Sequence, residues 1–350
     1  MKKKVLISYL DFSSFVKKDV SLLSDDFNID TYHFNCNKKS KLPFALIQQF
    51  LFLIWNLSKY NVLITQFAGY HSFLPALFGK IFGKKTIIIV GGTDAVSYPS
   101  INYGFFYKKP IKFFIILSYR FTSLIAPKHE SLIFFLDTYY GIDYPHQGIK
   151  YFLPALKTPF KVIYNGYDQK KWSFNGTKRK NHFITVCGGW EFEFQKTLKG
   201  IDLIIGIAEK FPNSTFEVIG IPDNSKLDNL PANFIRTPYV KNEELSEKLG
   251  MAEFYLQLSI SEGFPNALCE AMLCRCIPIV SNVAAMPYIV ENCGFILKNR
   301  NLQLLEILIK QALKSNKEEL GLKSRDRICM NFPEFKRKKE LIEVVNILSI

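Results

Sequence analysis

The chain has 350 residues, a formal net charge of +14 and 48% apolar residues. This length favours two domains over one, and the apolar content is enough for two cores. The positive charge favours anionic partners, which are nucleic acid, an anionic membrane surface or a phosphorylated substrate. The seven cysteines are odd in number and show no paired C-x-x-C spacing, so they favour a reduced, cytoplasmic protein over a disulfide framework or a zinc knuckle.

The amino terminus begins like a signal peptide, with lysines ahead of an apolar run. That run, Val5–Leu10, ends at Asp11 and is too short for the apolar core of a signal peptide. It is typical of a first β-strand. Elsewhere no stretch reaches the roughly 18 uncharged apolar residues of a membrane-spanning helix.

In the first half, apolar runs with strand-like residues alternate with helical patterns. Predicted strands are Val5–Leu10, Phe27–Phe34, Asn61–Phe67, Lys84–Val90, Ser123–Ala126 and Lys161–Tyr164. The alternation indicates an α/β domain with a doubly wound parallel sheet. The loop at 11–16 follows the first strand, where such sheets bind ligands, and it contains no glycine.

Two segments of this half each allow more than one interpretation. Residues 42–57 form an apolar, uncharged helix, which is either buried or partly inserted in a membrane surface. Residues 96–125 interleave basic and aromatic side chains. That composition is typical of nucleic-acid binding, of an interfacial helix on anionic lipid, or of a core-facing helix with a solvated basic edge.

The second half repeats the alternation. Its predicted strands are His182–Cys187, Ser214–Gly220, Phe234–Pro238, Phe254–Ile260, Ile277–Ser281 and Gly294–Leu297, and its predicted helices include Asn301–Lys314, Lys317–Met330 and Phe332–Ile350. We therefore predict a first Rossmann-like domain at 1–169, a polar linker at 170–181, a second Rossmann-like domain at 182–330 and a C-terminal helix at 331–350.

One stretch of the second domain carries the chemistry. After the strand at 254–260, Gly263 and Pro265 break the run, and good helix formers follow. The first N–H groups of that helix are a ready site for phosphate. Glu262 and Glu270 flank it, and carboxylates bind hydroxyl groups rather than phosphate. A ligand with central phosphates and a polyol at each end fits, which is a sugar nucleotide.

The run Ser261–Met272, with Pro278 after it, resembles the donor-site motif of the retaining GT-B glycosyltransferases of family 4, the glycosyl transferases group 1. Members of this kind build cell-surface polysaccharides. The resemblance implies a GT-B fold, with an acceptor-side and a donor-side Rossmann-like domain facing across a cleft. It also implies that the C-terminal helix crosses back to the first domain. It implies no cofactor and no bound metal, and no Asp-x-Asp metal signature is visible in the sequence.

A second motif of this family is an Arg-x-x-x-x-Lys-Gly segment whose two cations grip the donor diphosphate. Lys199 and Gly200 match it. The arginine is absent, because Phe194 stands at its spacing, and Lys196 is the candidate substitute. A fixed cation is expected here because the departing nucleoside diphosphate develops negative charge.

Two further loops resemble the family. Gly92 and Asp94 match a strand-to-loop signature, in which Gly91 stands where a histidine often approaches the donor sugar. The alternative for Asp94 is a helix cap in a plain turn. Tyr239 and Val240 occupy the loop that meets the nucleobase in relatives.

These matches imply the following roles. Glu270 would bind the ribose hydroxyls, and Glu262 would bind and orient the transferred sugar. Lys199 and Lys196 would hold the diphosphate together with the backbone of Gly263, Phe264, Pro265, Asn266 and Ala267. The donor would be UDP- or GDP-linked, and the acceptor would be a glycan or a lipid-linked molecule at the cytoplasmic face of the inner membrane.

Two other functions stay open. A sugar-nucleotide epimerase would have the same architecture, but it needs acid and base groups, and none of the five histidines lies in a donor motif. A catalytically inactive GT-B-like binding protein is the other, because the family arginine and histidine are missing and Tyr288 replaces a usual glutamate. Arg275 likewise stands where a glycine is common. Only the net charge favours a nucleic-acid binder, and we expect none.

Overall fold

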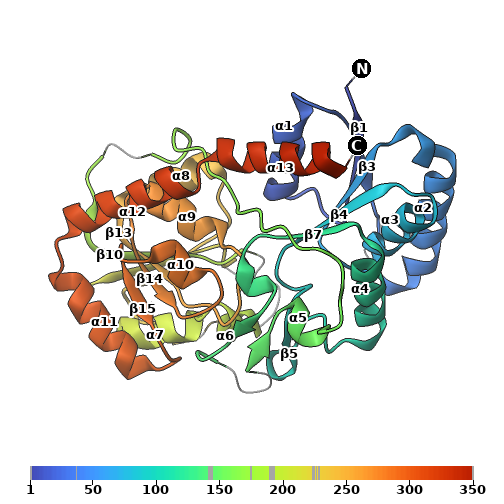
Figure 1. Ribbon diagram of the computed structural model, residues 1–350. Coiled ribbons are helices and arrows are strands. Elements are labelled where there is room, and N and C mark those ends of the chain that lie inside the picture. The colour runs from blue at the N-terminus through green and yellow to red at the C-terminus, as the bar shows by residue number, and fades with distance from the viewer. Residues whose placement is uncertain are drawn as a thin grey trace. The chain divides into compact units, whose positions relative to one another are not determined.

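The structure is a computed structural model that describes residues 2–36, 38–140, 145–173, 176–188, 194–222, 225, 227 and 229–348. The chain divides into two compact units (Figure 1). Unit 1 comprises Met1–Phe135, His146–Tyr164 and Phe335–Ile350, and unit 2 comprises Leu136–Pro145 and Asn165–Glu334. Of the residues that the sequence placed in the first domain, 136–140 and 165–169 therefore belong to unit 2.

Unit 1 contains a five-stranded parallel sheet with the strand order β2-β1-β3-β4-β7. Its strands are β1 (Lys4–Tyr9), β2 (Asn28–His33), β3 (Val62–Gln66), β4 (Lys85–Val90) and β7 (Leu124–Pro127). All five confirm strands predicted from the sequence. Strands of a parallel sheet are buried on both faces. Their sequences are therefore nearly continuous apolar and β-branched runs, as in β4.

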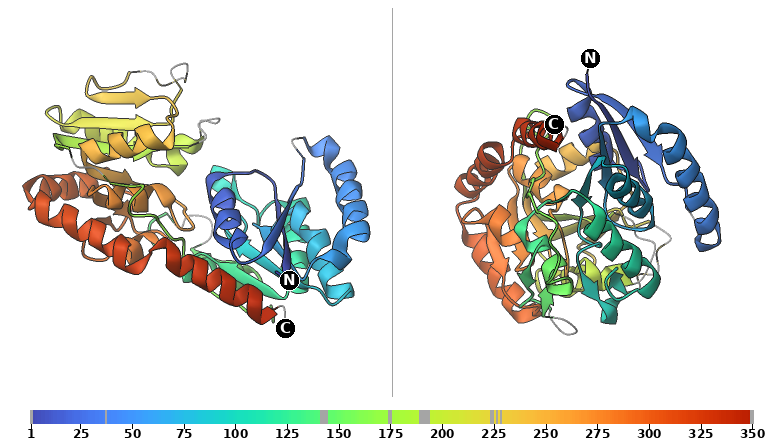
Figure 2. Two further views of the ribbon diagram at one scale, coloured as in Figure 1. Left: turned by 90° about the horizontal axis from the view of Figure 1, so that it is seen from above. Right: turned by 45° about the vertical axis from the view of Figure 1, so that its right-hand side comes forward.

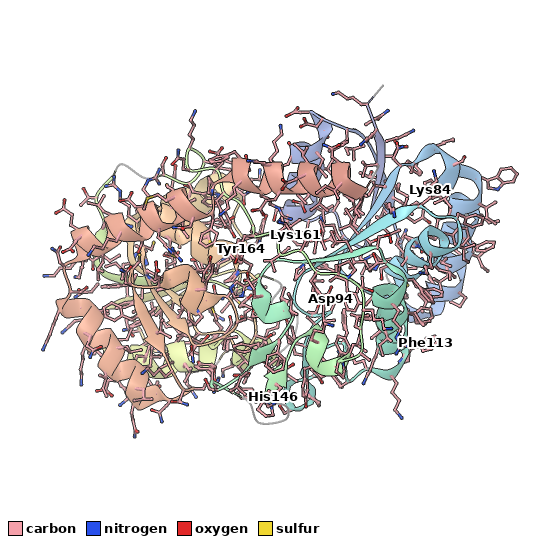
Figure 3. The ribbon with its side chains drawn as sticks, viewed as in Figure 1. Lys84, Asp94, Phe113, His146, Lys161 and Tyr164 are labelled. Carbon is pink, nitrogen blue, oxygen red and sulfur yellow. The ribbon has the colours of Figure 1, made fainter. Side chains whose placement is uncertain are left out.

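The prediction of a sixth strand in this half, at 161–164, is wrong. The segment lies outside the strands, although the amides of Lys161 and Ile163 donate to the carbonyls of Ile125 and Pro127. It therefore runs along the free edge of β7 without forming a full ladder. Figure 3 labels Lys161 and Tyr164 near its two ends.

Helices cover both faces of the unit 1 sheet (Figures 1 and 2). One face, which includes Val5 and Ile7 of β1, packs against α1 (Ser14–Ser24) and against Val345 and its neighbours on α13 (Glu334–Leu348). The opposite face packs against α2 (Leu42–Asn56), α3 (Tyr70–Ile81) and α4 (Lys109–Phe121). Successive strand residues point to opposite faces, so Leu6 joins the second cluster while its neighbours join the first.

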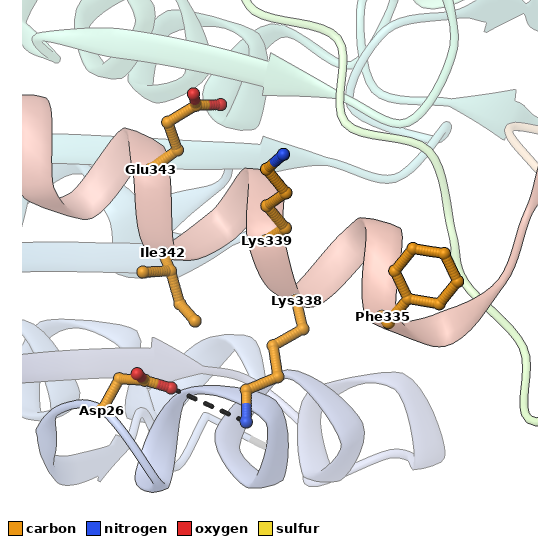
Figure 4. Close-up of a pocket in the computed structure, with 6 residues that line it drawn as sticks. All are labelled: Asp26, Phe335, Lys338, Lys339, Ile342 and Glu343. Atoms are coloured by element: carbon orange, nitrogen blue, oxygen red, sulfur yellow. Dashed lines mark ion pairs between the residues drawn. The ribbon is translucent and has the colours of Figure 1, made fainter.

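A buried ion pair attaches α13 to unit 1. The guanidinium of Arg337 donates to both carboxylate oxygens of Asp19 on α1, each over 2.7 Å, and to the carbonyls of Ile163 and Tyr164. At the surface, Lys338 pairs with Asp26 beside a shallow pocket between the two helices (Figure 4). The C-terminal helix thus belongs to the core of unit 1.

Unit 2 contains a six-stranded parallel sheet with the order β12-β11-β10-β13-β14-β15. Its strands are β10 (Arg179–Val186), β11 (Thr215–Ile219), β12 (Phe234–Thr237), β13 (Ala252–Gln257), β14 (Ile277–Ser281) and β15 (Phe295–Leu297). Each confirms a predicted strand. The predicted linker at 170–181 overlaps the start of β10.

The helices of unit 2 are α6 (Phe194–Leu198), α7 (Ile201–Lys210), α8 (Asn242–Met251), α9 (Asn266–Leu273), α10 (Met286–Val290), α11 (Leu302–Lys314) and α12 (Lys317–Asn331). Short elements complete the chain: β5 (Ser97–Tyr98), β6 (Tyr103–Gly104), β8 (Phe135–Leu136), β9 (His146–Gln147) and α5 (Ile149–Phe152). Within the described residues, no helix has the length and apolarity needed to cross a membrane.

Both sheets have a point where the strand order reverses direction. In unit 1 the chain passes from β1 outward to β2 and then returns to β3, so the reversal lies between β1 and β3. In unit 2 it lies between β10 and β13. Open α/β sheets bind ligands beyond the carboxyl ends of the strands at such a point. These two places are therefore where a site is expected.

Candidate functional site

The unit 2 site is built on the loop that joins β13 to α9. Pro265 is the N-cap of α9, with φ −70° and ψ 115°, so the helix predicted after Gly263 and Pro265 begins at Asn266. The ring of Phe264 is buried and packs edge-on against Phe332 with a centroid distance of 5.2 Å. The loop is therefore anchored by its own apolar side chain, and the first amides of α9 follow directly.

A clamp on this loop was missed in the sequence. The side-chain oxygen of Asn266 accepts from the amide of Asn165 over 3.0 Å and from the hydroxyl of Tyr167 over 2.9 Å. Both donors come from the segment 165–168, about 100 residues before α9 in the chain. This segment therefore holds the start of α9 through the side chain of Asn266.

The predicted cation and the first predicted glutamate form an ion pair. The ammonium of Lys199 lies 2.7 Å from Oε1 of Glu262, and both side chains are half-buried. The same oxygen accepts from the amide of Gln257 over 3.0 Å. In the described part of the chain no donor reaches the other oxygen, Oε2. The carboxylate is thus held on one side and available on the other.

Gly200 explains why Lys199 reaches this position. The glycine is the N-cap of α7 with φ +71°, and a Cβ there would lie 2.4 Å from the carbonyl oxygen of Leu258. The amide of Ile260 donates to the carbonyl of Leu198 over 2.8 Å. Only a glycine combines the left-handed conformation with this close approach. The Lys-Gly pair of the motif is therefore one structural unit.

The second predicted glutamate shares a buried neighbour with the first. Burial holds the pKa of the Tyr255 phenol well above its ordinary value, and the charges of Glu262 and Glu270 add to this effect. The hydroxyl of Tyr255 donates to Gln257, which in turn donates to Glu262. The charges of both glutamates therefore act on the same buried phenol.

The other residues of unit 2 that the sequence predicted for the site make no described contact with Lys199 or Glu262. Lys196 lies half-buried on α6, with no described partner for its ammonium. Tyr239 follows β12 and is 82% exposed, and Val240 is half-buried.

Gly92 and Asp94 lie in unit 1, at the end of β4 (Figure 3). The carboxylate of Asp94 is fully buried and accepts from the amides of Ala68, Gly91 and Gly92. Burial raises the pKa of Asp94, and these backbone hydrogen bonds oppose the rise. The aspartate shapes two neighbouring loops rather than capping a helix.

The structure explains the missing family histidine. A Cβ built on Gly91 would lie 1.5 Å from the ring of Phe67, so that ring fills the space a side chain at 91 would need. Phe67 itself has φ +66°, a conformation that is uncommon for residues other than glycine. This position is therefore occupied by an aromatic ring from the end of β3.

Solved structures share this architecture. Sucrose-phosphate synthase from Thermosynechococcus elongatus superposes with a TM-score of 0.72 at 12% identity, covering 99% of both chains. Anabaena HepE in complex with UDP-glucose gives 0.69 at 13% identity, covering 98% of this chain and 99% of that one. A glycosyltransferase from Rickettsia africae gives 0.65 at 12% identity, covering 99% and 98%. The chain has the GT-B fold that the sequence predicted.

A family model matches part of the sequence of the second unit. Residues 177–328 match the family "Glycosyl transferases group 1", whereas no curated protein matches the chain. The match covers fewer than half of the 350 residues and confirms the resemblance drawn from the motif at 261–272.

Proposed function

We propose that the chain is a cytoplasmic enzyme that transfers a sugar from a UDP- or GDP-linked donor to a glycan or lipid-linked acceptor in cell-surface polysaccharide synthesis. The reaction would retain the anomeric configuration and use no bound metal. The observation that carries the proposal is the ion pair of Lys199 with Glu262 at the switch point of unit 2. A cation, two carboxylates and the first amides of a helix there match the parts of a sugar nucleotide.

Each group has a role that its chemistry allows. The amides at the start of α9 and the ammonium groups of Lys199 and Lys196 bind the diphosphate. Glu270 accepts hydrogen bonds from the ribose hydroxyls, and Glu262 accepts them from the transferred sugar. Tyr239 is exposed and offers its ring to the nucleobase, beside Val240. Donor binding draws Lys199 from the carboxylate to the diphosphate, which leaves both oxygens of Glu262 for sugar hydroxyls.

Retention needs no protein nucleophile in this scheme. The C–O bond between the sugar and the donor phosphate breaks as the acceptor hydroxyl attacks the same face, and the leaving phosphate takes the hydroxyl proton. Lys199 stabilises the charge that develops on that phosphate. The two glutamates then act as binding groups, unlike the acid and base pair of glycoside hydrolases.

The structures of HepE with UDP and with UDP-glucose support a nucleotide-sugar donor. A thermal-shift screen of the full-length protein against UDP- and GDP-sugars tests the proposal, because a ligand that binds only the folded state raises its stability. We expect one nucleotide class to raise the unfolding temperature and Lys199→Ala to remove the rise. No shift with any donor would contradict it.

Product analysis separates the rival functions. An altered sugar nucleotide formed without an acceptor would indicate an epimerase, whereas donor turnover at background would indicate an inactive binding protein. Transfer to an added acceptor would exclude both.

The exposed face of α2 favours contact with an anionic membrane. Six large apolar side chains on this helix are between 43% and 76% exposed: Phe44, Ile47, Phe50, Leu51, Ile54 and Trp55. The helix carries no charge, while Lys38, Lys41 and Lys59 lie at its ends. An apolar face with flanking lysines is typical of a helix that lies in a lipid interface.

The other candidate segment is mostly internal, since Phe106 and Tyr119 are buried and only Phe113 is a large exposed apolar residue of α4. We expect the protein to sediment with anionic liposomes at low salt. Trp55→Asp should abolish sedimentation, whereas the control Phe113→Asp should retain it. A wild-type protein that stays in the supernatant would exclude membrane contact through α2.

A further inference from the structure

A row of polar side chains follows β13 and leads to Glu262. Tyr255 and Gln257 lie on this strand and Ser259 lies just beyond it, at alternate positions that face the same side. Their exposed fractions are 0%, 4% and 0%. β13 lies inside a parallel sheet, where side chains on both faces are normally apolar. Polar groups buried in such a place are costly unless they are hydrogen-bonded.

Hydrogen bonds connect these groups in one direction. The hydroxyl of Tyr255 donates to Oε1 of Gln257 over 2.9 Å. The side-chain nitrogen of Gln257 donates to the hydroxyl oxygen of Ser259 over 2.8 Å and to Oε1 of Glu262 over 3.0 Å. An ionised carboxylate only accepts hydrogen bonds, so the nitrogen of the amide must face Glu262 and its oxygen must face the phenol. The charge of Glu262 therefore sets the direction of the whole row.

The neighbouring strand anchors the backbone of this row. The hydroxyl of Ser281, at the end of β14, donates to the carbonyl of Ser259 over 2.6 Å and to that of Gln257 over 3.4 Å. Both N–H groups of the Gln257 amide are engaged, and its oxygen has a donor. Rotation of the amide by half a turn would bring its oxygen against the carboxylate of Glu262. Gln257 is therefore held in one orientation.

Glu262 shares this support with Lys199. Both Gln257 and Lys199 donate to Oε1, whereas no donor in the described part of the chain reaches Oε2. Under the proposed function, the donor diphosphate draws Lys199 away from the carboxylate. One lone pair of Oε1 is then released, while Gln257 keeps the other. Gln257 is thus the partner that Glu262 retains when the ligand is bound.

We propose that Gln257 is a positioning residue for the transferred sugar and that Tyr255 acts through it. Gln257 holds the carboxylate of Glu262 in one orientation, which offers Oε2 and one lone pair of Oε1 to sugar hydroxyls. The inference rests on the proposed function, because it uses the sugar-binding role of Glu262. It adds that a buried amide behind this carboxylate sets the affinity for the sugar of the donor and leaves the affinity for its nucleotide unchanged.

Two ligands separate these affinities in calorimetry on the full-length protein. They are UDP and the UDP-sugar, or GDP and the GDP-sugar, that raises the unfolding temperature most in the thermal-shift screen. We expect Gln257→Met to weaken binding of the nucleotide sugar by about tenfold, as loss of one charge-assisted hydrogen bond does, and to keep the Kd of the nucleoside diphosphate within about twofold. Gln147→Met, which removes a buried glutamine of unit 1, is the matched control and should change neither Kd.

The remaining outcomes of this experiment are distinct. Equal weakening of both ligands by Gln257→Met would show a structural role, and no weakening of the nucleotide sugar would show no role. Either result overturns the inference and leaves the proposed function standing. If neither ligand binds the wild type, the proposed function fails, and the inference fails with it.

A double-variant cycle tests the part assigned to Tyr255. Tyr255→Phe should weaken binding of the nucleotide sugar several-fold, because the amide of Gln257 loses the donor that orients it. In a Gln257→Met background the same change should have no further effect on this Kd. Additive losses would show that Tyr255 does not act through Gln257 and would overturn that assignment.

Gln257→Glu keeps the shape of the side chain and carries the test if Gln257→Met does not fold. Its carboxylate repels that of Glu262 when both are ionised and donates to it when protonated, so binding of the nucleotide sugar should be weak near about pH 8 and tighten several-fold by about pH 5.5. Lys199 and Glu270 lie near the pair and are also present in the wild type, which is the control. A pH slope equal to that of the wild type would overturn the inference.

Discussion

The two sheet edges of this chain use a lysine in opposite ways. In unit 2, Lys199 is paired with Glu262 over 2.7 Å, and that carboxylate is held by Gln257. In unit 1, Lys128 lies between two rings and makes no hydrogen bond to any described residue. Lys199 lies beyond the carboxyl end of β10, where the strand order of unit 2 reverses, whereas Lys128 follows β7 at the outer edge of the unit 1 sheet.

The difference shows two ways to keep a lysine in a folded protein. The ion pair of Lys199 neutralises its ammonium, so a ligand of that ammonium would have to replace Glu262 as its partner. Lys128 is held by packing against the rings of Phe15 and Phe67, and a buried ammonium without an acceptor reduces stability.

The largest effect is expected where a buried charge in unit 1 does have a partner. Arg337→Met should leave Asp19 buried without its cation and destabilise the protein by about 3–5 kcal/mol. Burial raises the pKa of Asp19, but the charge and hydrogen bonds of Arg337 outweigh it, so the pKa is below its ordinary value. This carboxylate therefore contributes stability above its unfolded pKa, which is lost as pH falls through the folded one.

Urea unfolding at neutral pH measures this effect, and Lys128→Met in the same assay sharpens the contrast. The double variant Asp19→Asn with Arg337→Met should recover part of the loss, because no charge stays unpaired. If Arg337→Met and Lys128→Met had the same free energy of unfolding, the expected difference between a paired and an unpaired buried charge in unit 1 would be contradicted.

The paired cation of unit 2 should be tested by turnover. Lys199→Ala removes a charge-assisted contact to the leaving diphosphate, and Glu270→Gln removes the charge that binds ribose hydroxyls. Such a contact contributes roughly 1.5–3 kcal/mol, so each change should slow sugar transfer by about tenfold or more while the protein stays folded. Lys196→Ala is the matched lysine variant and reports whether that residue replaces the family arginine. Near-wild-type transfer in both Lys199→Ala and Glu270→Gln would refute the site.

Local sequence predicted most of the fold but not its long-range pairings. The strands and the start of α9 follow from apolar runs, Gly263 and Pro265, which act over a few residues. The clamp from Asn165 and Tyr167 to Asn266 links segments about 100 residues apart, and no periodicity signals it. The prediction of a strand at 161–164 is wrong for the same reason, because a strand requires a neighbouring strand as well as a suitable composition.

One departure from the family pattern gains a physical explanation only from the backbone. Arg275 follows the end of α9 with φ +63°, and the amide of Cys276 donates back to the carbonyl of Ala271. This is the helix-terminating position at which glycine is favoured. The sequence could show that the residue was unusual there, but not that the left-handed conformation is retained.

The smallest effect tests the clamp that unit 2 has on its binding loop. Tyr167→Phe removes one of the two donors to the side chain of Asn266 and leaves Asn165 in place. Loss of a single hydrogen bond should destabilise the protein by about 1 kcal/mol. If the clamp positions the amides of α9 for a diphosphate, the Kd for the nucleotide should rise several-fold. Calorimetry measures the Kd and urea unfolding measures the stability of the same variant. A loss of stability with an unchanged Kd would show that the clamp serves the fold alone, whereas a weaker Kd would show that the segment 165–168 positions the loop for the nucleotide.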